Sequence, residues 1–227
     1  MDKRPKISVV IPVYEQKGLG QVFLKHSLDI LAKQTFRDFE VVVSDNSTYF
    51  FQSQMEKLCW QYPFVRYTRC KEVGLVVNTN NAIRHAKGEL IKILFQDDFL
   101  YDENSLQDIA DNFKGDWMVT ACEHSLDGKT MTRPFYPKYN ANIYLGENTI
   151  SSPSVLTYRN EDPLLFDEKL TMLMDCDMYR RLYDKFGEPT ILNKINVVNR
   201  TGSHQVSMNI TPAQMNDELT YIKEKYV

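Results

Sequence analysis

Short apolar runs alternate with amphipathic stretches through the first hundred residues. The apolar runs predict strands at Ile7–Val13, Phe39–Ser44, Val65–Thr68 and Leu90–Phe95. The stretches between them predict helices at Leu19–Gln34, Phe51–Tyr62 and Val76–Lys87, the last of which is followed by Gly88. Strands that alternate with helices typically form a mostly parallel sheet with helices on both faces. We therefore expect an α/β fold.

The pattern becomes less regular after residue 98. The second half predicts a helix at Asn104–Phe113, a strand at Trp117–Cys122, a turn at Asp127–Gly128, a strand at Val155–Tyr158, a helix at Cys176–Phe186, a strand at Ile191–Val198 and a helix after Pro212. The segment Met131–Ile150 is aromatic and interrupted by Pro134, Pro137 and Gly146, which predicts irregular structure. Because no repeat, linker or low-complexity segment separates the halves, residues 1–227 are expected to form a single domain.

Composition narrows the class of protein. With 43% hydrophobic residues among 227, the chain can form one sizeable core. The net charge of −3 provides no broad positive field, so nucleic acid is not an expected partner. Four scattered cysteines without a CxxC pair argue against a zinc site and a disulfide framework.

The location of the protein is also expected from simple patterns. The opening MDKRPKISVVIPV lacks the features of a signal peptide. No apolar run reaches the ~18 residues of a membrane span. A cytoplasmic protein is expected, with peripheral membrane association and the oligomeric state left open.

Polar residues follow three of the predicted strands: Pro12 to Glu15, Asp45 and Asn46, and Asp97 and Asp98. Ligands collect at the carboxyl ends of parallel strands, so these clusters are expected on one rim. Adjacent carboxylates repel one another unless a cation is present, which favours a metal at Asp97 and Asp98. The simpler interpretation of each acid is a turn former or a helix cap.

Four segments together resemble the inverting family 2 of GT-A glycosyltransferases. In chain order they are ISVVIPVYE, FEVVVSDNST, VGLVVNTNNAIRHAKGELIKILFQDD and FDEKLTMLMDCDMYRRL. The resemblance covers most of Ile7 to Leu182. It implies the GT-A fold, a Rossmann-like, mostly parallel sheet flanked by helices. It also implies a nucleotide-binding half at about residues 1–100 and a mixed acceptor-binding half at about residues 101–227.

The resemblance implies a binding site for a nucleotide-sugar donor. Its expected contacts are Pro12, Val13 and Tyr14 along the base, Glu15 near the ribose, Asp45 on the base ring nitrogen, Asn80 beside the diphosphate, and Gln96 with Asp97. A carboxylate at Asp45 can accept a hydrogen bond from uracil but finds no ring NH on cytosine, which favours a UDP-sugar. Thr79 stands where an arginine is common in the family.

The resemblance also implies a divalent metal, Mn²⁺ or Mg²⁺, that bridges the donor diphosphate. Asp97 matches the residue that binds the metal, with Asp98 and His204 as further ligands. Phe95 replaces the first aspartate of the family motif, so a single principal carboxylate ligand is expected.

Asp175 matches the general base that deprotonates the acceptor hydroxyl, while Asp177 is expected to point elsewhere on the same helix. The simpler interpretation is that both acids favour the start of a helix through the macrodipole.

The predicted function is metal-dependent, inverting transfer of a sugar from a nucleotide-sugar to a hydroxyl of a glycan or lipid-linked saccharide. Two alternatives are left open. A sugar nucleotidyltransferase shares the acidic metal ligands, although the loop VYEQKGLG is poorly suited to holding a triphosphate. A catalytically impaired relative that acts as a binding subunit is the other, because Phe95 and Met174 depart from the family pattern. The sequence identifies neither the sugar nor the acceptor.

Overall fold

The computed structural model describes residues 3–205, 208 and 210–226. Within these residues, eight strands form one sheet in the order β3-β2-β1-β4-β7-β6-β8-β5. The strands are β1 (Ile7–Val13), β2 (Phe39–Asp45), β3 (Val65–Arg69), β4 (Leu90–Ile93), β5 (Phe99–Leu100), β6 (Trp117–Ser125), β7 (Leu156–Arg159) and β8 (Thr190–Arg200).

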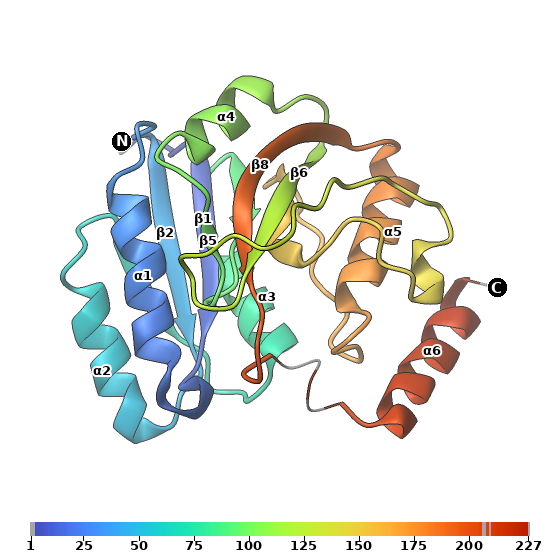
Figure 1. The fold of residues 1–227 in the computed structure, drawn as a ribbon, viewed down its shortest axis with the longest axis horizontal. Helices are drawn as coiled ribbons and strands as arrows, with labels where there is room; N and C mark the ends of the chain where they lie inside the picture. The colour runs from blue at the N-terminus through green and yellow to red at the C-terminus, as the bar shows by residue number, and fades with distance from the viewer. Residues whose placement is uncertain (1–2, 206–207, 209, 227) are drawn as a thin grey trace.

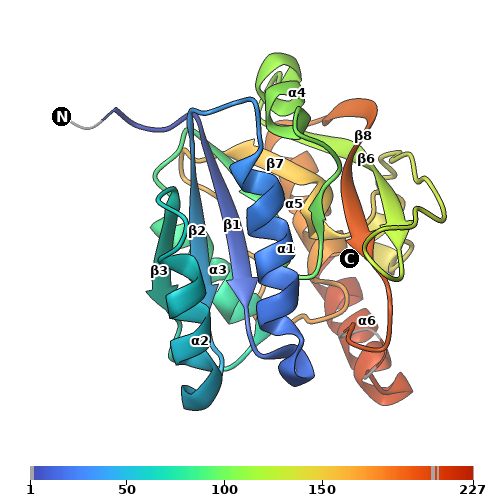
Figure 2. The ribbon, with the colours of Figure 1, turned by 60° about the vertical axis from the view of Figure 1, so that its left-hand side comes forward.

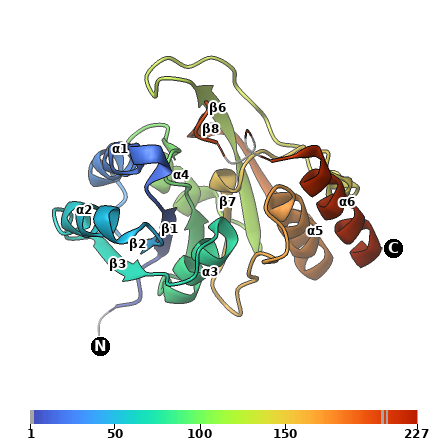
Figure 3. The same cartoon turned by 90° about the horizontal axis from the view of Figure 1, so that it is seen from below.

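The helices cover both faces of this sheet. They are α1 (Gly20–Ala32), α2 (Tyr49–Cys59), α3 (Leu75–His85), α4 (Ser105–Asn112), α5 (Met174–Phe186) and α6 (Pro212–Tyr226), with short 3₁₀ turns η1 (Gln16–Gly18), η2 (Ile143–Leu145) and η3 (Pro153–Val155). Helices α1 and α2 lie on one face of β1 to β3, and α3 lies on the other (Figures 1, 2 and 3). Helix α6 lies beside α5, far from α1 and α2 (Figures 1 and 3).

The predicted parallel sheet of the first half is confirmed. β1 pairs in parallel with both β2 and β4, and β2 pairs in parallel with β3. Every residue of β1 is buried, which explains why Ser8 is the only polar residue in the strand. Parallel pairing brings the ends of β1 and β2 to the same edge, since Val13 is in register with Asp45.

The second half adds antiparallel pairs, as the expectation of a mixed half requires. β7 runs antiparallel to β4 and to β6, whereas β6 and β8 are parallel. Strand β4 ends at Ile93, two residues before the predicted end at Phe95. Beyond the strand, the Phe95 N–H donates to Ser154 Oγ at 2.9 Å and not to a neighbouring strand. The two-residue strand β5 was too short to predict.

The predicted helices differ from the observed ones only at their ends, and the segment 131–150 is irregular apart from η2, as predicted. All four cysteines are free and buried. Across the described residues, no helix combines the length and the apolar character needed to cross a membrane.

Candidate active site

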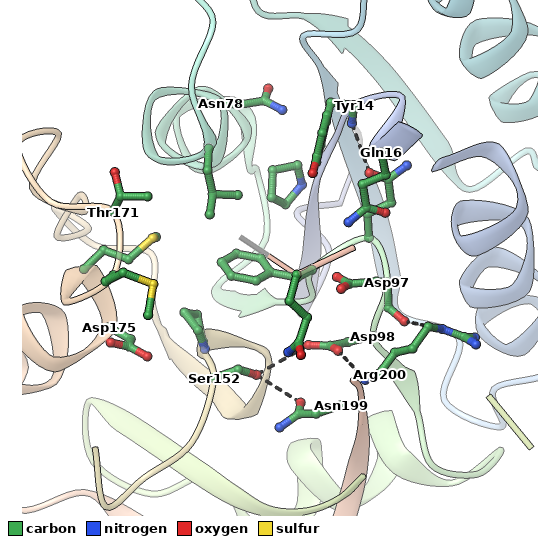
Figure 4. A pocket seen from close by; sticks show the side chains of 18 of the residues that line it. Tyr14, Gln16, Asn78, Asp97, Asp98, Ser152, Thr171, Asp175, Asn199 and Arg200 are labelled. Atoms are coloured by element: carbon green, nitrogen blue, oxygen red, sulfur yellow. Dashed lines mark hydrogen bonds between the residues drawn. The ribbon is translucent and has the colours of Figure 1, made fainter. Parts of the chain in front are cut away.

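A cavity of about 870 Å³ lies at the carboxyl ends of β1, β2 and β4 and extends to the start of α5 (Figure 4). Its lining includes residues that the sequence predicted and others that it did not: Pro12, Tyr14, Glu15, Asn46, Thr48, Phe95, Gln96, Asp97, Asp98, Phe135, Asn148, Met174, Asp175 and Arg200. The cavity therefore joins side chains from both halves of the chain.

Gln96 fixes the loop that follows β1. Its Oε1 accepts the Tyr14 N–H at 3.0 Å, and its Nε2 donates to the Gly20 carbonyl at 2.7 Å. A Cβ on Gly20 would lie 2.1 Å from the Tyr14 carbonyl oxygen, so only glycine fits at this position between β1 and α1. Gln96 thus lines the cavity and also sets the position of Tyr14.

The same loop carries backbone strain. Gln16 and Lys17 have φ of 41° and 57°, in the left-handed region that residues with a Cβ rarely adopt. The Glu15 carbonyl accepts the N–H groups of Gly18 and Gly20, at 2.7 and 3.0 Å, which holds the loop in this shape. The Glu15 carboxylate also accepts the Thr48 N–H at 3.1 Å, tying this loop to the one after β2. Strained loops of this kind cluster at functional sites.

Asp45 lies behind the cavity wall. Its side chain is fully buried and accepts the Ser47 N–H at 2.8 Å and the Tyr67 hydroxyl at 2.7 Å. The Arg69 guanidinium is 3.6 Å away. The Asp45 carboxylate, which was expected to contact the nucleotide base, thus accepts hydrogen bonds from within the protein. The neighbouring Asn46 lines the cavity.

Two other predicted donor contacts also lie outside the lining. The Val13 side chain is buried in the core. The Asn80 amide donates to the Phe166 carbonyl at 2.9 Å and accepts the Phe166 N–H at 2.8 Å, so it fixes the 166–168 segment. Asn78, two residues earlier in α3, lines the cavity and donates to the Val13 carbonyl at 3.0 Å.

Asp97 lines the cavity, and the predicted ligand His204 lies beside it without being one of the lining residues. Asp97 Oδ2 lies 3.1 Å from His204 Nε2, although the arrangement falls short of a hydrogen bond. Nε2 is buried and has no hydrogen-bond partner within the described part of the chain. Mg²⁺ and Mn²⁺ bound to nucleotides typically take one or two protein ligands besides phosphate oxygens and water. A carboxylate oxygen beside an unpartnered imidazole nitrogen fits such a cation.

Asp98 is held apart from this pair. Its carboxylate accepts the Arg200 N–H at 2.9 Å and the Ser152 hydroxyl at 3.4 Å. Burial, and to a smaller degree the neighbouring Asp97, raises the pKa of Asp98 to about 8. Among the residues described, no group of three or more His, Cys, Asp or Glu side chains is placed to hold a metal. The three predicted ligands are therefore not gathered into one cluster.

Arg200 supports the main chain at Asp97, a role that sequence reasoning did not assign. Its Nε donates to the Asp97 carbonyl at 3.1 Å, and its guanidinium lies 4.7 Å from the Phe23 ring and 5.5 Å from the Phe99 ring. The only signal in the sequence was its position at the end of a strand, four residues before His204.

Asp175 lies in the first turn of α5 and lines the cavity on the other side from Asp97 (Figure 4). Its carboxylate accepts the Asn148 amide at 2.7 Å and the Cys176 N–H at 2.7 Å. Burial raises the pKa of Asp175 to about 6. A carboxylate with that pKa is well suited to accept a proton near neutral pH. Asn148 was missed because it lies in the segment predicted to be irregular.

Asp177 faces a different set of partners. Its buried carboxylate accepts from Arg181 Nε, Lys225 Nζ and the Tyr226 hydroxyl, each at 2.7 Å. Only Asp175 of the two acids lines the cavity.

Residues 8–186 match the sequence model of glycosyl transferase family 2. The chain belongs to this family. Membership of this family supports a role in glycosyl transfer and does not favour the nucleotidyltransferase alternative.

Two curated relatives are glycosyltransferases. WcaA of Escherichia coli (strain K12), a glycosyl transferase provisionally assigned to colanic acid biosynthesis, is 25% identical over 202 residues, or 83% of this chain and 70% of WcaA. The GalNAc(5)-diNAcBac-PP-undecaprenol β-1,3-glucosyltransferase of Campylobacter jejuni is 31% identical over 99 residues, or 42% of this chain and 31% of that enzyme.

Solved structures share the fold. S. aureus TarS residues 1–349 in complex with UDP has a TM-score of 0.70 at 21% identity, covering 96% of this chain and 64% of that one. The mannosyltransferase PcManGT from Pyrobaculum calidifontis, in complex with GDP-Man and Mn²⁺, has a TM-score of 0.59 at 16% identity, covering 97% and 70%. The predicted GT-A fold is confirmed. The chain spans less than two thirds of the TarS fragment.

Proposed function

We propose that this family 2 glycosyltransferase is a metal-dependent, inverting enzyme that transfers a sugar from a nucleotide-sugar to a hydroxyl group. The observation that carries the proposal is a cavity lined by Asp97 at one side and by the hydrogen-bonded carboxylate of Asp175 at the other (Figure 4). His204 Nε2 lies 3.1 Å from the Asp97 carboxylate. Residues 1–100 would hold the donor, and residues 101–227 would form the acceptor half.

The donor would lie across the loops that follow β1 and β2. Pro12, Tyr14 and Glu15 line the first of these loops, and Asn46 and Thr48 line the second. A UDP-sugar is the leading candidate, because TarS has been solved with UDP and with UDP-GlcNAc. GDP-sugars are the next class to test, since PcManGT was solved with GDP-Man.

A divalent cation would be held by Asp97 and His204. When bound, it supplies positive charge that stabilises the diphosphate leaving group. Arg200 keeps the Asp97 main chain in place through its 3.1 Å hydrogen bond. Asp98 would act through that same segment rather than as a ligand, because its carboxylate is bound by the Arg200 N–H and Ser152.

Asp175 would be the general base. Its carboxylate accepts the proton of the acceptor hydroxyl as that oxygen attacks the anomeric carbon. The bond from the anomeric carbon to the diphosphate oxygen breaks on the opposite face, and its electron pair leaves with the nucleotide. One displacement inverts the configuration and needs no covalent intermediate. Asn148 and the Cys176 N–H orient the carboxylate for this step.

The acceptor would enter beside Asp175. Phe135, Met172 and Met174 give this part of the cavity apolar surfaces, against which a sugar ring can pack. A glycan or a lipid-linked saccharide is the proposed acceptor, in line with the undecaprenol-linked substrate named for the Campylobacter relative.

The substitution Asp175→Asn tests the base. We expect kcat to fall ~10²–10⁴-fold, while UDP affinity measured by calorimetry in the presence of Mn²⁺ stays unchanged. Asp217→Asn, which removes the same charge from an exposed position on α6, is the matched control. Full transfer activity in Asp175→Asn would show that the base is another group.

A donor screen tests the activity itself. The protein would be incubated with UDP-, GDP- and TDP-sugars and Mn²⁺, and hydrolysis would be followed by release of the nucleotide. We expect hydrolysis of at least one UDP-sugar. The absence of hydrolysis with every donor, together with no nucleotide binding by calorimetry, would instead favour a non-catalytic binding subunit.

A further inference from the structure

A carboxylate from the last helix holds the segment that leads into α5. Glu218 of α6 accepts three consecutive main-chain N–H groups, from Thr171, Met172 and Leu173, at 2.9, 2.8 and 2.9 Å. The first N–H groups of a helix and its flanking residues need partners from outside the helix. Leu173 occupies the N-cap position of α5 and offers no side-chain cap. Glu218 thus holds the N-cap residue and the two residues before it, from a helix about 45 residues further along the chain.

This segment is also a wall of the cavity. Thr171, Met172 and Met174 line it together with Asp175. Only Met174 separates Asp175 from Leu173, the last residue whose N–H group Glu218 binds. The position of the Asp175 main chain therefore depends on where α6 places the Glu218 carboxylate.

The helix that carries Glu218 is itself firmly attached. Lys225 Nζ donates to Asp167 and to the buried Asp177, both at 2.7 Å. The Tyr221 hydroxyl donates to Asp167 at 2.8 Å, and Ile222 is fully buried in the core. These contacts bind α6 to α5 and to the segment before it, beside which it lies in Figures 1 and 3. Glu218 is thereby held in a fixed place relative to the cavity.

We propose that Glu218 is a positioning residue for the transfer reaction, acting by holding residues 171–173 so that Asp175 meets the acceptor hydroxyl. This inference rests on the proposed role of Asp175 as the base. Glu218 does not line the cavity and so acts only through the main chain that it binds. Without it, three N–H groups lose their common acceptor and the segment relaxes. A displacement of the base by about 1 Å is enough to lower the rate ~10²-fold.

The test compares Glu218→Ala and Glu218→Gln with Glu224→Gln, an exposed position on the same helix. The readouts are kcat and KM for hydrolysis of the donor identified by the screen, and UDP binding with Mn²⁺ by calorimetry. We expect Glu218→Ala to lower kcat by ~10–100-fold while leaving UDP affinity unchanged. Glu218→Gln keeps one acceptor oxygen and should be intermediate. Glu224→Gln should behave as wild type.

Hydrogen exchange gives a readout that does not depend on activity. In Glu218→Ala, the amides of residues 171–173 should exchange faster than in wild type, while those of β1 should be unchanged. If Glu218→Ala does not fold, the comparison of Glu218→Gln with Glu224→Gln carries the test. Wild-type kcat in Glu218→Gln, with unchanged exchange at residues 171–173, would overturn the proposal.

A double variant separates this inference from the proposed base. If Glu218 acts through Asp175, adding Glu218→Ala to Asp175→Asn should cause little further loss of kcat. Multiplied losses would show that Glu218 acts by another route and would overturn the positioning role while leaving the base intact. Full activity in Asp175→Asn alone would instead overturn the base assignment.

Discussion

At the scale of single residues, Asp175 is distinguished by its surroundings. Its half-buried carboxylate lines the cavity and receives hydrogen bonds from Asn148 and from the Cys176 N–H. Burial disfavours the charged form and the hydrogen bonds favour it, and burial prevails, since the pKa is raised to about 6. The surroundings of Asp175 therefore bring the pKa of its carboxyl close to neutral pH.

The pH dependence of kcat should report this carboxyl. Because only the ionised form can accept a proton, we expect kcat to rise with pH through an apparent pKa of about 6 and then level off. Asn148→Ala removes a hydrogen bond to the ionised form. It should therefore raise the apparent pKa of the kcat profile by up to about one unit. Rate profiles from pH 5 to 8 measure both. An unchanged apparent pKa in Asn148→Ala would contradict the assignment of this ionisation to Asp175.

Stability should follow the same ionisation with a defined sign. The pKa of Asp175 is higher in the folded chain than its ordinary value of 3.8, so the folded state retains the proton longer. Its contribution to stability is present below pH 4 and is lost as the pH rises through about 6. Asp175→Asn should therefore not lower Tm at pH 8, and a lower Tm would show that the carboxylate has a structural role.

Metal binding is a second property of individual residues. His204→Ala should weaken UDP binding in the presence of Mn²⁺ by about tenfold, because it removes one of the two side chains at the site. Without metal, UDP binding should equal that of wild type. Calorimetry with and without Mn²⁺ separates the two cases, and His85→Ala, at an exposed histidine on α3, is the control. Equal losses with and without Mn²⁺ would exclude His204 as a ligand.

At the scale of elements, the junction between β1 and α1 is set by a close approach. The Gly20 carbonyl and the Tyr14 N–H share Gln96, and no space remains for a Cβ on Gly20. Gly20→Ala should lower the free energy of unfolding by ~1–3 kcal/mol and weaken UDP binding, because Tyr14 and Glu15 must move.

Gly115→Ala is the control for this junction. Gly115 has φ of +69° and no atom within 4 Å of the added Cβ. Gly115→Ala should lower stability only because alanine is strained at this positive φ. The variant should keep its affinity for UDP. Urea unfolding and calorimetry provide the two measurements. Unchanged UDP affinity in Gly20→Ala would show that the loop after β1 adjusts without consequence for the site.

At the scale of the whole molecule, α6 is joined to α5 through a buried charge. Asp177 is fully buried and is neutralised from α6 by Lys225 and within α5 by Arg181. Removing one partner of a buried carboxylate is costly because the charge stays in the interior. Lys225→Met should lower the free energy of unfolding by ~1–3 kcal/mol, measured by urea unfolding. Lys223→Met, at an exposed position, should change it little, and equal losses would contradict this account.

The order of apolar and polar residues was enough to predict the parallel half of the fold and, with the family resemblance, two sides of the site. β1 and β2 read as apolar runs because they are buried between helices, and in parallel strands the residues that follow each run meet at one edge. This reasoning placed Tyr14 and Asp97 on the cavity, and the family resemblance placed Asp175 there. Buried strands and their ends leave local patterns of apolar and polar residues. These patterns can be recognised in the sequence alone.

The groups that each of these side chains contacts could not be predicted, because they depend on how the folded chain packs. Asp45 is bound by Tyr67 on a neighbouring strand, and Asn148 reaches Asp175 from an irregular segment 27 residues earlier. Glu218 binds the segment before α5 from the far end of the chain. Such hydrogen bonds join residues that no periodicity relates, and their geometry depends on how helices and irregular segments pack. The sequence therefore predicts where the chemistry lies, and packing decides which groups are free to take part in it.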